Sequence, residues 1–173
     1  MKKREILKWF ILAIAISINL FILINAFING EVSAKESNSV AHTAADVINT
    51  VKPETITPKN FDKFAFDIRK IFGHFLLFAL SGGFTTWAEY LFLKNTKLGY
   101  FVWQLCLTFG FGFLLALITE FAQIFVAGRT GAWSDVGIDT LGYFIGVFPV
   151  ILILLLKKSP IFLKPKNKKN QAE

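Results

Sequence analysis

Four long apolar blocks dominate the sequence and decide what kind of fold it can form. Residues 9–28, 98–119 and 136–156 are almost uninterrupted apolar segments, apart from Asp139 in the last, and residues 71–93 form a fourth block of similar length. The third span is expected to continue to about residue 125. A helix rises about 1.5 Å per residue, so roughly 20 apolar residues cross the hydrocarbon core of a bilayer. A soluble chain of 173 residues could not bury 20 phenylalanines in its core. We therefore predict an all-α integral membrane protein, a bundle of about four transmembrane helices.

Basic residues gather at particular ends of these blocks. They precede the first block and follow the second and fourth, at Lys2, Lys3, Arg4, Lys8, Lys94, Lys97, Lys157, Lys158, Lys164, Lys166, Lys168 and Lys169. Residues 30–70 are balanced, with six basic and six acidic residues. Because positive charge favours the cytoplasmic side, we predict a multi-pass protein of the cell membrane with both termini in the cytoplasm. Residues 157–173 are then a basic cytoplasmic tail near anionic headgroups, and the net charge does not indicate nucleic-acid binding.

The first apolar block fits either a signal peptide or a membrane anchor. Val32-Ser33-Ala34 resembles a signal-peptidase site, so cleavage after Ala34 is one alternative. The apolar run of residues 9–28 is longer than the roughly 7–15 residues usual in a signal peptide. This length favours an uncleaved transmembrane anchor within residues 1–30.

Between the first two predicted spans, residues 31–60 form an extracytoplasmic linker. Thr43 is placed to cap a short helix that runs through Lys52. From Asn60 onward, apolar residues recur on one helical face, which predicts an outer helical segment. It is either an interfacial helix or an extended first turn of the second span. Residues 61–156 then form one membrane domain.

Polar side chains that are far apart in the sequence are predicted to meet at the outer level of the membrane. Carboxylates inside a membrane are costly and normally face the bundle interior, paired with a cation or lining a wet cavity. Arg129 is the expected partner because its planar guanidinium can bind a carboxylate at two points, with Lys70 or a protonated His74 as other partners. The predicted binding residues are Lys70, His74, Glu120, Gln123, Arg129, Asp135 and Asp139.

Two interpretations of this cluster are open. The charged pairs either fasten the outer ends of three helices or form a polar site for a headgroup, a sugar phosphate or a peptide carboxylate. The number of groups at one level favours a site. If the site is catalytic, His74, Glu120 and Asp135 are the candidates for proton transfer, although no pattern identifies a reaction. A single histidine with no nearby cysteine does not indicate a zinc site, so no metal or cofactor is expected.

Two further features concern the spans themselves. Gly142 and Gly146 are four residues apart on the face that carries Asp139, and this pattern lets a neighbouring helix approach closely. The neighbour lies either in the same bundle or in another protomer, so an oligomer is compatible with the sequence. Glu89, near the inner end of the second span, is expected to extend toward Lys94 or Lys97.

At these residues the sequence resembles the VanZ-like family, bacterial membrane proteins associated with resistance to glycopeptide antibiotics such as teicoplanin. The likeness rests on Arg69-Lys70-Ile71-Phe72-Gly73-His74-Phe75 and on an ordered series of residues, Glu120, Gln123, Gly128-Arg129, Asp135, Asp139, Gly142 and Gly146. It covers roughly residues 61–156. Asp139 departs from the family pattern, which leads us to expect Asn at that position.

The resemblance implies a role in the cell envelope, for which three functions are open. In the first, the polar cluster binds or modifies an envelope lipid or a lipid-linked cell-wall precursor and so lowers susceptibility to teicoplanin-type antibiotics. In the second, the protein is a transporter or flippase component, although the inner halves of the third and fourth spans offer few polar groups. In the third, it is a scaffold or regulatory partner of an envelope protein. We rank the first ahead, with membrane lipids as the expected partners.

Overall fold

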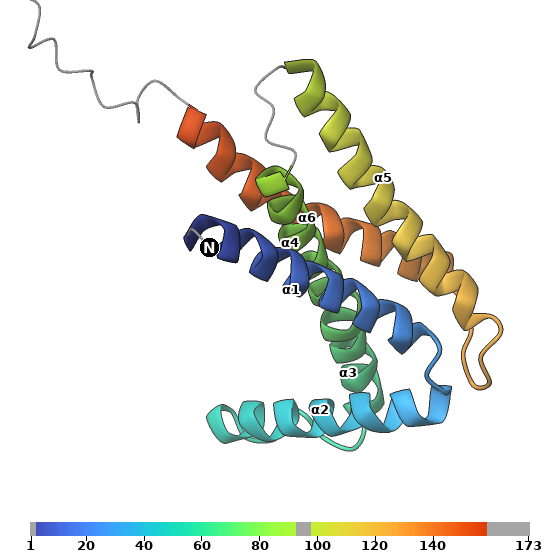
Figure 1. Cartoon of the computed structure of the whole chain (residues 1–173). Coiled ribbons are helices and arrows are strands. Elements are labelled where there is room, and N and C mark those ends of the chain that lie inside the picture. Colours follow the sequence, from blue (N-terminus) through green and yellow to red (C-terminus); the bar gives the residue numbers. More distant parts are fainter. Residues whose placement is uncertain (1–2, 93–97, 159–173) are drawn as a thin grey trace, which may run out of the picture.

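The computed structural model describes residues 3–92 and 98–158, which form helices joined by short turns and contain no strand. The elements are α1 (Lys3–Ala26), α2 (Gly30–Val51), α3 (Phe61–Ile68), η1 (Arg69–Leu76), α4 (Leu77–Phe92), α5 (Leu98–Gln123) and α6 (Trp133–Lys158). α3, η1 and α4 follow one another without a break, so they form a single long helix (Figure 1). The predicted all-α fold is confirmed.

Four helical segments are long and apolar enough to cross a membrane. They are Glu5–Ala26, Phe61–Phe92, Val102–Gln123 and Trp133–Ile153. Large apolar side chains are exposed on all four, for example Phe21, Leu80, Phe121 and Phe148. Such surfaces are stable against lipid chains and unfavourable in water. The chain is therefore a multi-pass membrane protein.

The continuous helix that contains α4 lies at the centre of the bundle. α4 packs against α1 and α6, and α5 packs mainly against α6 (Figure 1). The main buried cluster joins all four spans and consists of Ile22, Phe78, Leu115, Ala116, Val136, Tyr143 and Val147. A smaller cluster of Ile11, Ala15 and Ala88 joins α1 to α4.

Gly142 and Gly146 let α6 lie directly against the continuous helix. A Cβ atom at Gly142 would lie under 3.0 Å from the carbonyl oxygen of Phe75, and one at Gly146 would lie equally close to that of Ala79. Real Cβ atoms do not approach other atoms so closely, so only glycine fits at these two positions. The structure thus places the Gly-xxx-Gly pair in a helix contact within one chain.

α2 begins earlier than the sequence suggested. The expected start near Thr43 is wrong, because the helix begins at Gly30, with Asn29 as its cap; the Asn29 side chain accepts a 2.8 Å hydrogen bond from the backbone N–H of Glu31. The residues that α2 buries are Gly30, Ala41 and Ala45, and such small residues give little hydrophobic pattern. α2 crosses the end of the bundle near α3 and contacts α3 and η1 (Figure 1).

The structure decides between the two interpretations of the segment after Asn60. The backbone stays right-handed helical from α3 into α4, with φ −58° at Ile68, −59° at Arg69 and −64° at Leu77. The segment is therefore an extension of the second span, and α2 supplies the separate helix that crosses the bundle end. η1 is π-helical, a form in which one turn widens and which is frequent at functional sites.

Candidate functional site

An ion pair and an imidazole–carboxylate contact connect η1 to the beginning of α6. Lys70 Nζ lies 2.5 Å from Asp135 Oδ1, and His74 Nδ1 lies 3.1 Å from Asp139 Oδ1. Lys70 and His74 are four residues apart on one helix, as are Asp135 and Asp139 on the other. Equal spacing on the two facing helices therefore produces two parallel pairs. The Lys70 ammonium also lies 4.9 Å from the centre of the Phe66 ring.

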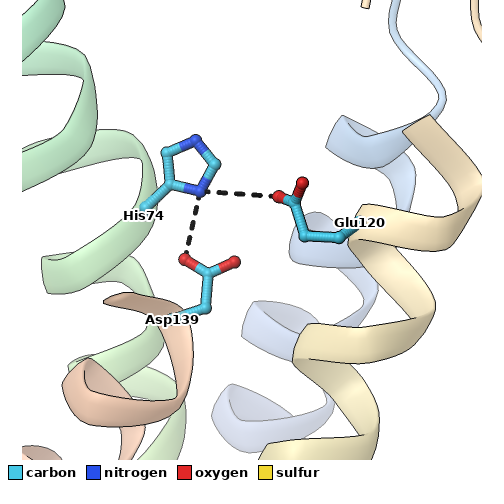
Figure 2. A group of neighbouring side chains, drawn as sticks. All are labelled: His74, Glu120 and Asp139. Carbon is cyan, nitrogen blue, oxygen red and sulfur yellow. Dashed lines mark hydrogen bonds and ion pairs between the residues drawn. The ribbon is translucent and has the colours of Figure 1, made fainter. Parts of the chain in front are cut away.

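Glu120 brings α5 to the second of these pairs. Its Oε1 atom lies 3.9 Å from His74 Nδ1, the ring nitrogen that also faces Asp139 (Figure 2). His74 is 8% exposed, Glu120 3% and Asp139 1%. We call these three residues the buried trio. Three side chains from three separate helices thus meet in the bundle interior. The sequence led us to expect such a meeting of distant polar residues at one level of the membrane.

The Glu120 carboxylate is held by two donors. Gln123 Nε2 donates to Oε1 at 3.1 Å, and the backbone N–H of Ala132 donates to Oε2 at 2.9 Å. Gln123 lies one helical turn along α5, whereas Ala132 directly precedes α6. Glu120 therefore orients one oxygen toward His74 and at the same time fixes the start of α6 against the end of α5.

Arg129 has a different partner from the one expected. Its guanidinium donates to two backbone carbonyls at the end of α1, from Nε to Ile28 at 3.0 Å and from Nη2 to Asn25 at 3.1 Å. α1 ends just before Ile28, so no helical N–H reaches the Ile28 carbonyl, whereas the Asn25 carbonyl also accepts a 3.3 Å bond from the backbone N–H of Ile28. Burial lowers the pKa of Arg129, and the nearby Arg69 guanidinium lowers it further, although an arginine remains charged. Arg129 thus fastens the loop between α5 and α6 to α1.

A glycine contact supports the same junction. The backbone N–H of Gly30 donates to Ala127 at 3.0 Å, and Gly128 packs against Gly30 too closely for a Cβ atom on Gly30. Gly128 has a φ of 74°, a left-handed conformation that favours glycine. The Gly128-Arg129 pair that carried part of the family resemblance therefore builds this junction.

A cavity of about 310 Å³ opens beside the buried trio. Its wall includes residues of α1, α2, α3, η1, α4, α5 and α6, with His74 and Asp139 among them. The other charged and amide side chains in the wall are Asn25, Glu36, Arg69, Gln123 and Arg129, and the large apolar ones include Phe21, Ile22, Phe72 and Phe78. Of the predicted binding residues, Lys70, Glu120 and Asp135 are not part of this wall. The site is thus a cavity whose wall combines two arginines and two carboxylates with apolar side chains.

Sequence reasoning missed a second polar group deeper in the bundle. Asn19 in α1 bonds to two α4 hydroxyls: its Nδ2 donates to Thr85 at 3.1 Å, and its Oδ1 accepts from Ser81 at 2.8 Å. Single polar residues inside apolar blocks give no sequence pattern, so nothing marked them as partners. The bundle interior therefore contains polar groups between α1 and α4 in addition to the few expected in the third and fourth spans.

Glu89 also has an unexpected partner. It accepts a hydrogen bond from the Thr108 hydroxyl of α5 and thus lies between two spans. Lys94 and Lys97, the partners expected from the sequence, lie outside the described residues. The Glu89 carboxylate therefore contributes to the contact between α4 and α5.

The fold and the site together define a multi-pass membrane protein with an ionisable cluster buried between three spans. The family model VanZ/LLP1 matches residues 9–156, and the chain belongs to this family. The match begins in α1, so the family relationship includes the first span in addition to the residues 61–156 on which the resemblance rested. The comparisons with curated proteins and with solved structures gave no match.

The Lys70–Asp135 pair gives a first test of the site's geometry. Both side chains are mostly buried, with 23% and 17% exposed, so the pair is shielded from salt and water. We expect Asp135→Asn to lower the free energy of unfolding by about 1–3 kcal/mol. In a double-mutant cycle with Lys70→Met, the coupling energy should be about 1–2 kcal/mol, measured by thermal unfolding in detergent. Additive effects of the two substitutions would show that the ion pair does not form.

Proposed function

We propose that the cavity binds the headgroup of an anionic envelope lipid or of a lipid-linked cell-wall precursor. Through this binding, the protein would lower susceptibility to teicoplanin-type antibiotics. The observation that supports the proposal is the wall of the cavity, where two guanidinium groups, besides the carboxylates of Glu36 and Asp139, accompany several aromatic and aliphatic side chains. This combination suits a molecule with a negatively charged head and an apolar chain.

The chemistry of the wall favours phosphate. Arginine binds phosphate oxygens through its planar set of donors, and the Arg69 side chain has no hydrogen bond or ion pair within residues 3–92 and 98–158. Arg129 contributes positive charge while its Nε and Nη2 atoms hold α1. A volume of about 310 Å³ is at the lower end of the range for small-molecule sites, so a headgroup fits and a whole lipid does not. The lipid chain would continue along the apolar surface of the spans.

The charge distribution supports an extracytoplasmic position for this cavity. Basic residues occupy the first turns of α1, at Lys3, Arg4 and Lys8, and the last turn of α6, at Lys157 and Lys158. Positive residues favour the cytoplasm. With the termini inside, α2 and the loop between α5 and α6 face outward. The cavity would then meet the leaflet where cell-wall precursors are used.

Arg69→Gln tests this proposal more sharply than a change of Arg129, because it removes charge from the cavity and breaks no bond between described residues. We expect the variant to accumulate normally in the membrane and to lose the protection against teicoplanin that the wild type gives a sensitive Gram-positive host. Binding of a polyprenyl phosphate to purified protein, measured by native mass spectrometry, should weaken at least tenfold. A neutral lipid with the same chain should bind both proteins equally weakly.

Lys63→Gln is the matched control for this experiment. Lys63 is an exposed cation on α3 that does not line the cavity, so the variant should protect and bind as the wild type does. Equal loss in both variants would mean that general surface charge attracts the lipid, and unchanged binding in Arg69→Gln would contradict the proposed site. If the wild type binds the lipid but gives no protection, the lipid site would stand and the role in resistance would be excluded.

A scaffold function is the second candidate, because several site residues join helices to one another. Arg129 bonds to carbonyls at the end of α1, and Glu120 bonds to the residue that precedes α6. In that case, substitutions at these two residues would lower abundance, and Arg69→Gln would have no effect. The abundance and protection of the three variants together distinguish the two functions.

A further inference from the structure

The buried trio contains more negative charge than its neighbours balance. Lys70 is paired with Asp135, and Arg129 is bonded to backbone carbonyls. Glu120 and Asp139 then share one imidazole, so even a protonated His74 leaves an excess negative charge. A charge buried between membrane spans is costly unless a cation compensates it. The trio therefore requires either a proton on a carboxyl group or an additional cation.

The geometry of the trio fits a metal ion. One ligand atom from each residue lies within 4.8 Å of the others, and His74 Nδ1 is 3.1 Å from Asp139 Oδ1 and 3.9 Å from Glu120 Oε1. Metal bonds of about 2.0–2.2 Å in a tetrahedral site place ligand atoms roughly 3.3–3.6 Å from one another. The observed separations bracket this range, so small side-chain rotations would bring all three atoms onto one ion.

The surroundings of the trio also resemble those of a metal centre. The Glu120 carboxylate is oriented by the Gln123 amide and by the N–H of Ala132, as carboxylate ligands usually are. Asp139 is 1% exposed, yet it and His74 line the 310 Å³ cavity. An ion held by the trio would therefore have protein on one side and an open coordination position toward the cavity.

We propose that His74, Glu120 and Asp139 bind a divalent transition-metal ion of the Zn²⁺ or Mn²⁺ type, which accept imidazole nitrogen together with carboxylate oxygen. The ion neutralises the two carboxylates and presents an open position to water or to an anionic oxygen in the cavity. The expectation of no metal counted only the single histidine and left out the two carboxylates that α5 and α6 bring beside it. This inference does not depend on the lipid, because it concerns only the three ligands.

The test is a direct measurement of metal binding. Purified full-length protein is stripped with a chelator and then dialysed against Mn²⁺ or Zn²⁺, and the bound metal is determined by elemental analysis. We expect a single saturable site per chain in the wild type. Glu120→Gln and Asp139→Asn should weaken the affinity at least tenfold, because each removes a charged ligand. The bound ion should also raise the melting temperature of the wild type and not that of Asp139→Asn.

Glu89→Gln is the control for loss of a buried carboxylate. Glu89 lies 15 residues beyond His74 on the same helix, roughly 22 Å away, so its variant should bind metal as the wild type does. X-ray absorption of the zinc-loaded wild type should show nitrogen and oxygen ligands without sulfur, and this result does not require a folded variant. No saturable binding below about 1 mM in the wild type would overturn the proposal. Sulfur ligation, or equal affinity in wild type and Asp139→Asn, would assign the metal to another place and also overturn it.

Discussion

Gly146→Ala is expected to lower the stability of the bundle more than any other single-methyl change in α6. The added Cβ would meet the backbone carbonyl of Ala79 at under 3.0 Å, and backbone cannot rotate away as a side chain can. α6 would have to move away from α4 along its largest helix contact. Overpacking of this kind costs about 1–3 kcal/mol, and Gly146→Val should cost more. Thermal unfolding in detergent and abundance in the membrane should both fall.

Gly137→Ala provides the matched control on the same helix. Nothing lies within 4 Å of a Cβ atom at Gly137, so the substitution should have no packing cost. Alanine is also favoured over glycine in a helix by about 1 kcal/mol, which would make Gly137→Ala neutral or slightly stabilising. If the two variants were equally stable, α6 would not lie directly on α4 as described.

The spans could be predicted from the sequence because lipid requires long apolar helices, and that requirement leaves a direct pattern. The start of α2 could not be predicted, because this helix packs through small residues that leave little hydrophobic pattern in the sequence. Gly30 fits against Gly128 from a distant loop, and Ala41 and Ala45 bury small side chains. A polar helix that packs through glycine and alanine has the composition of a linker. Hydrophobic periodicity therefore underestimates the length of such a helix.

The site was predictable to the level of helix faces but not of individual bonds. The spacing of Lys70 and His74 matched that of Asp135 and Asp139, and the structure brings these residues together in two pairs. Arg129 could not be assigned in the same way, because its partners are backbone carbonyls and the sequence does not show which carbonyls lack a helical partner. The bond between Asn19 and Thr85 depends similarly on the rotation of α1 relative to α4.

Asp139 connects the resemblance to the metal proposal. The family pattern led us to expect Asn at this position, and an Asn would accept a hydrogen bond from His74 without adding charge. The observed carboxylate supplies the second negative charge of the buried trio. Asp139→Asn therefore keeps the size and shape of the side chain while it removes the property on which metal binding depends.

Arg129→Ala is expected to remove most of the folded protein from the membrane. The substitution removes both Arg129 bonds at the junction that joins α1, α2 and the loop between α5 and α6. The Ile28 carbonyl then loses its donor, and the Asn25 carbonyl keeps only the 3.3 Å bond from the backbone N–H of Ile28. A hydrogen bond from a charged donor contributes about 1.5–3 kcal/mol, and water reaches this partly buried position only in part. We expect the free energy of unfolding to fall by about 2–4 kcal/mol. Arg129→Lys should recover little of it, because an ammonium cannot reproduce the two-point geometry.

Comparison with Arg69→Gln separates the two interpretations of the charged cluster, since both substitutions remove one positive charge from the same cavity. Membrane abundance, melting temperature and protection against teicoplanin should be measured for both variants on the same preparations. If only Arg129→Ala loses abundance and Arg69→Gln is abundant but inactive, Arg129 holds the helices together and Arg69 binds the ligand. An Arg129→Ala variant that accumulates normally but does not protect would instead place Arg129 among the binding residues and contradict its structural role.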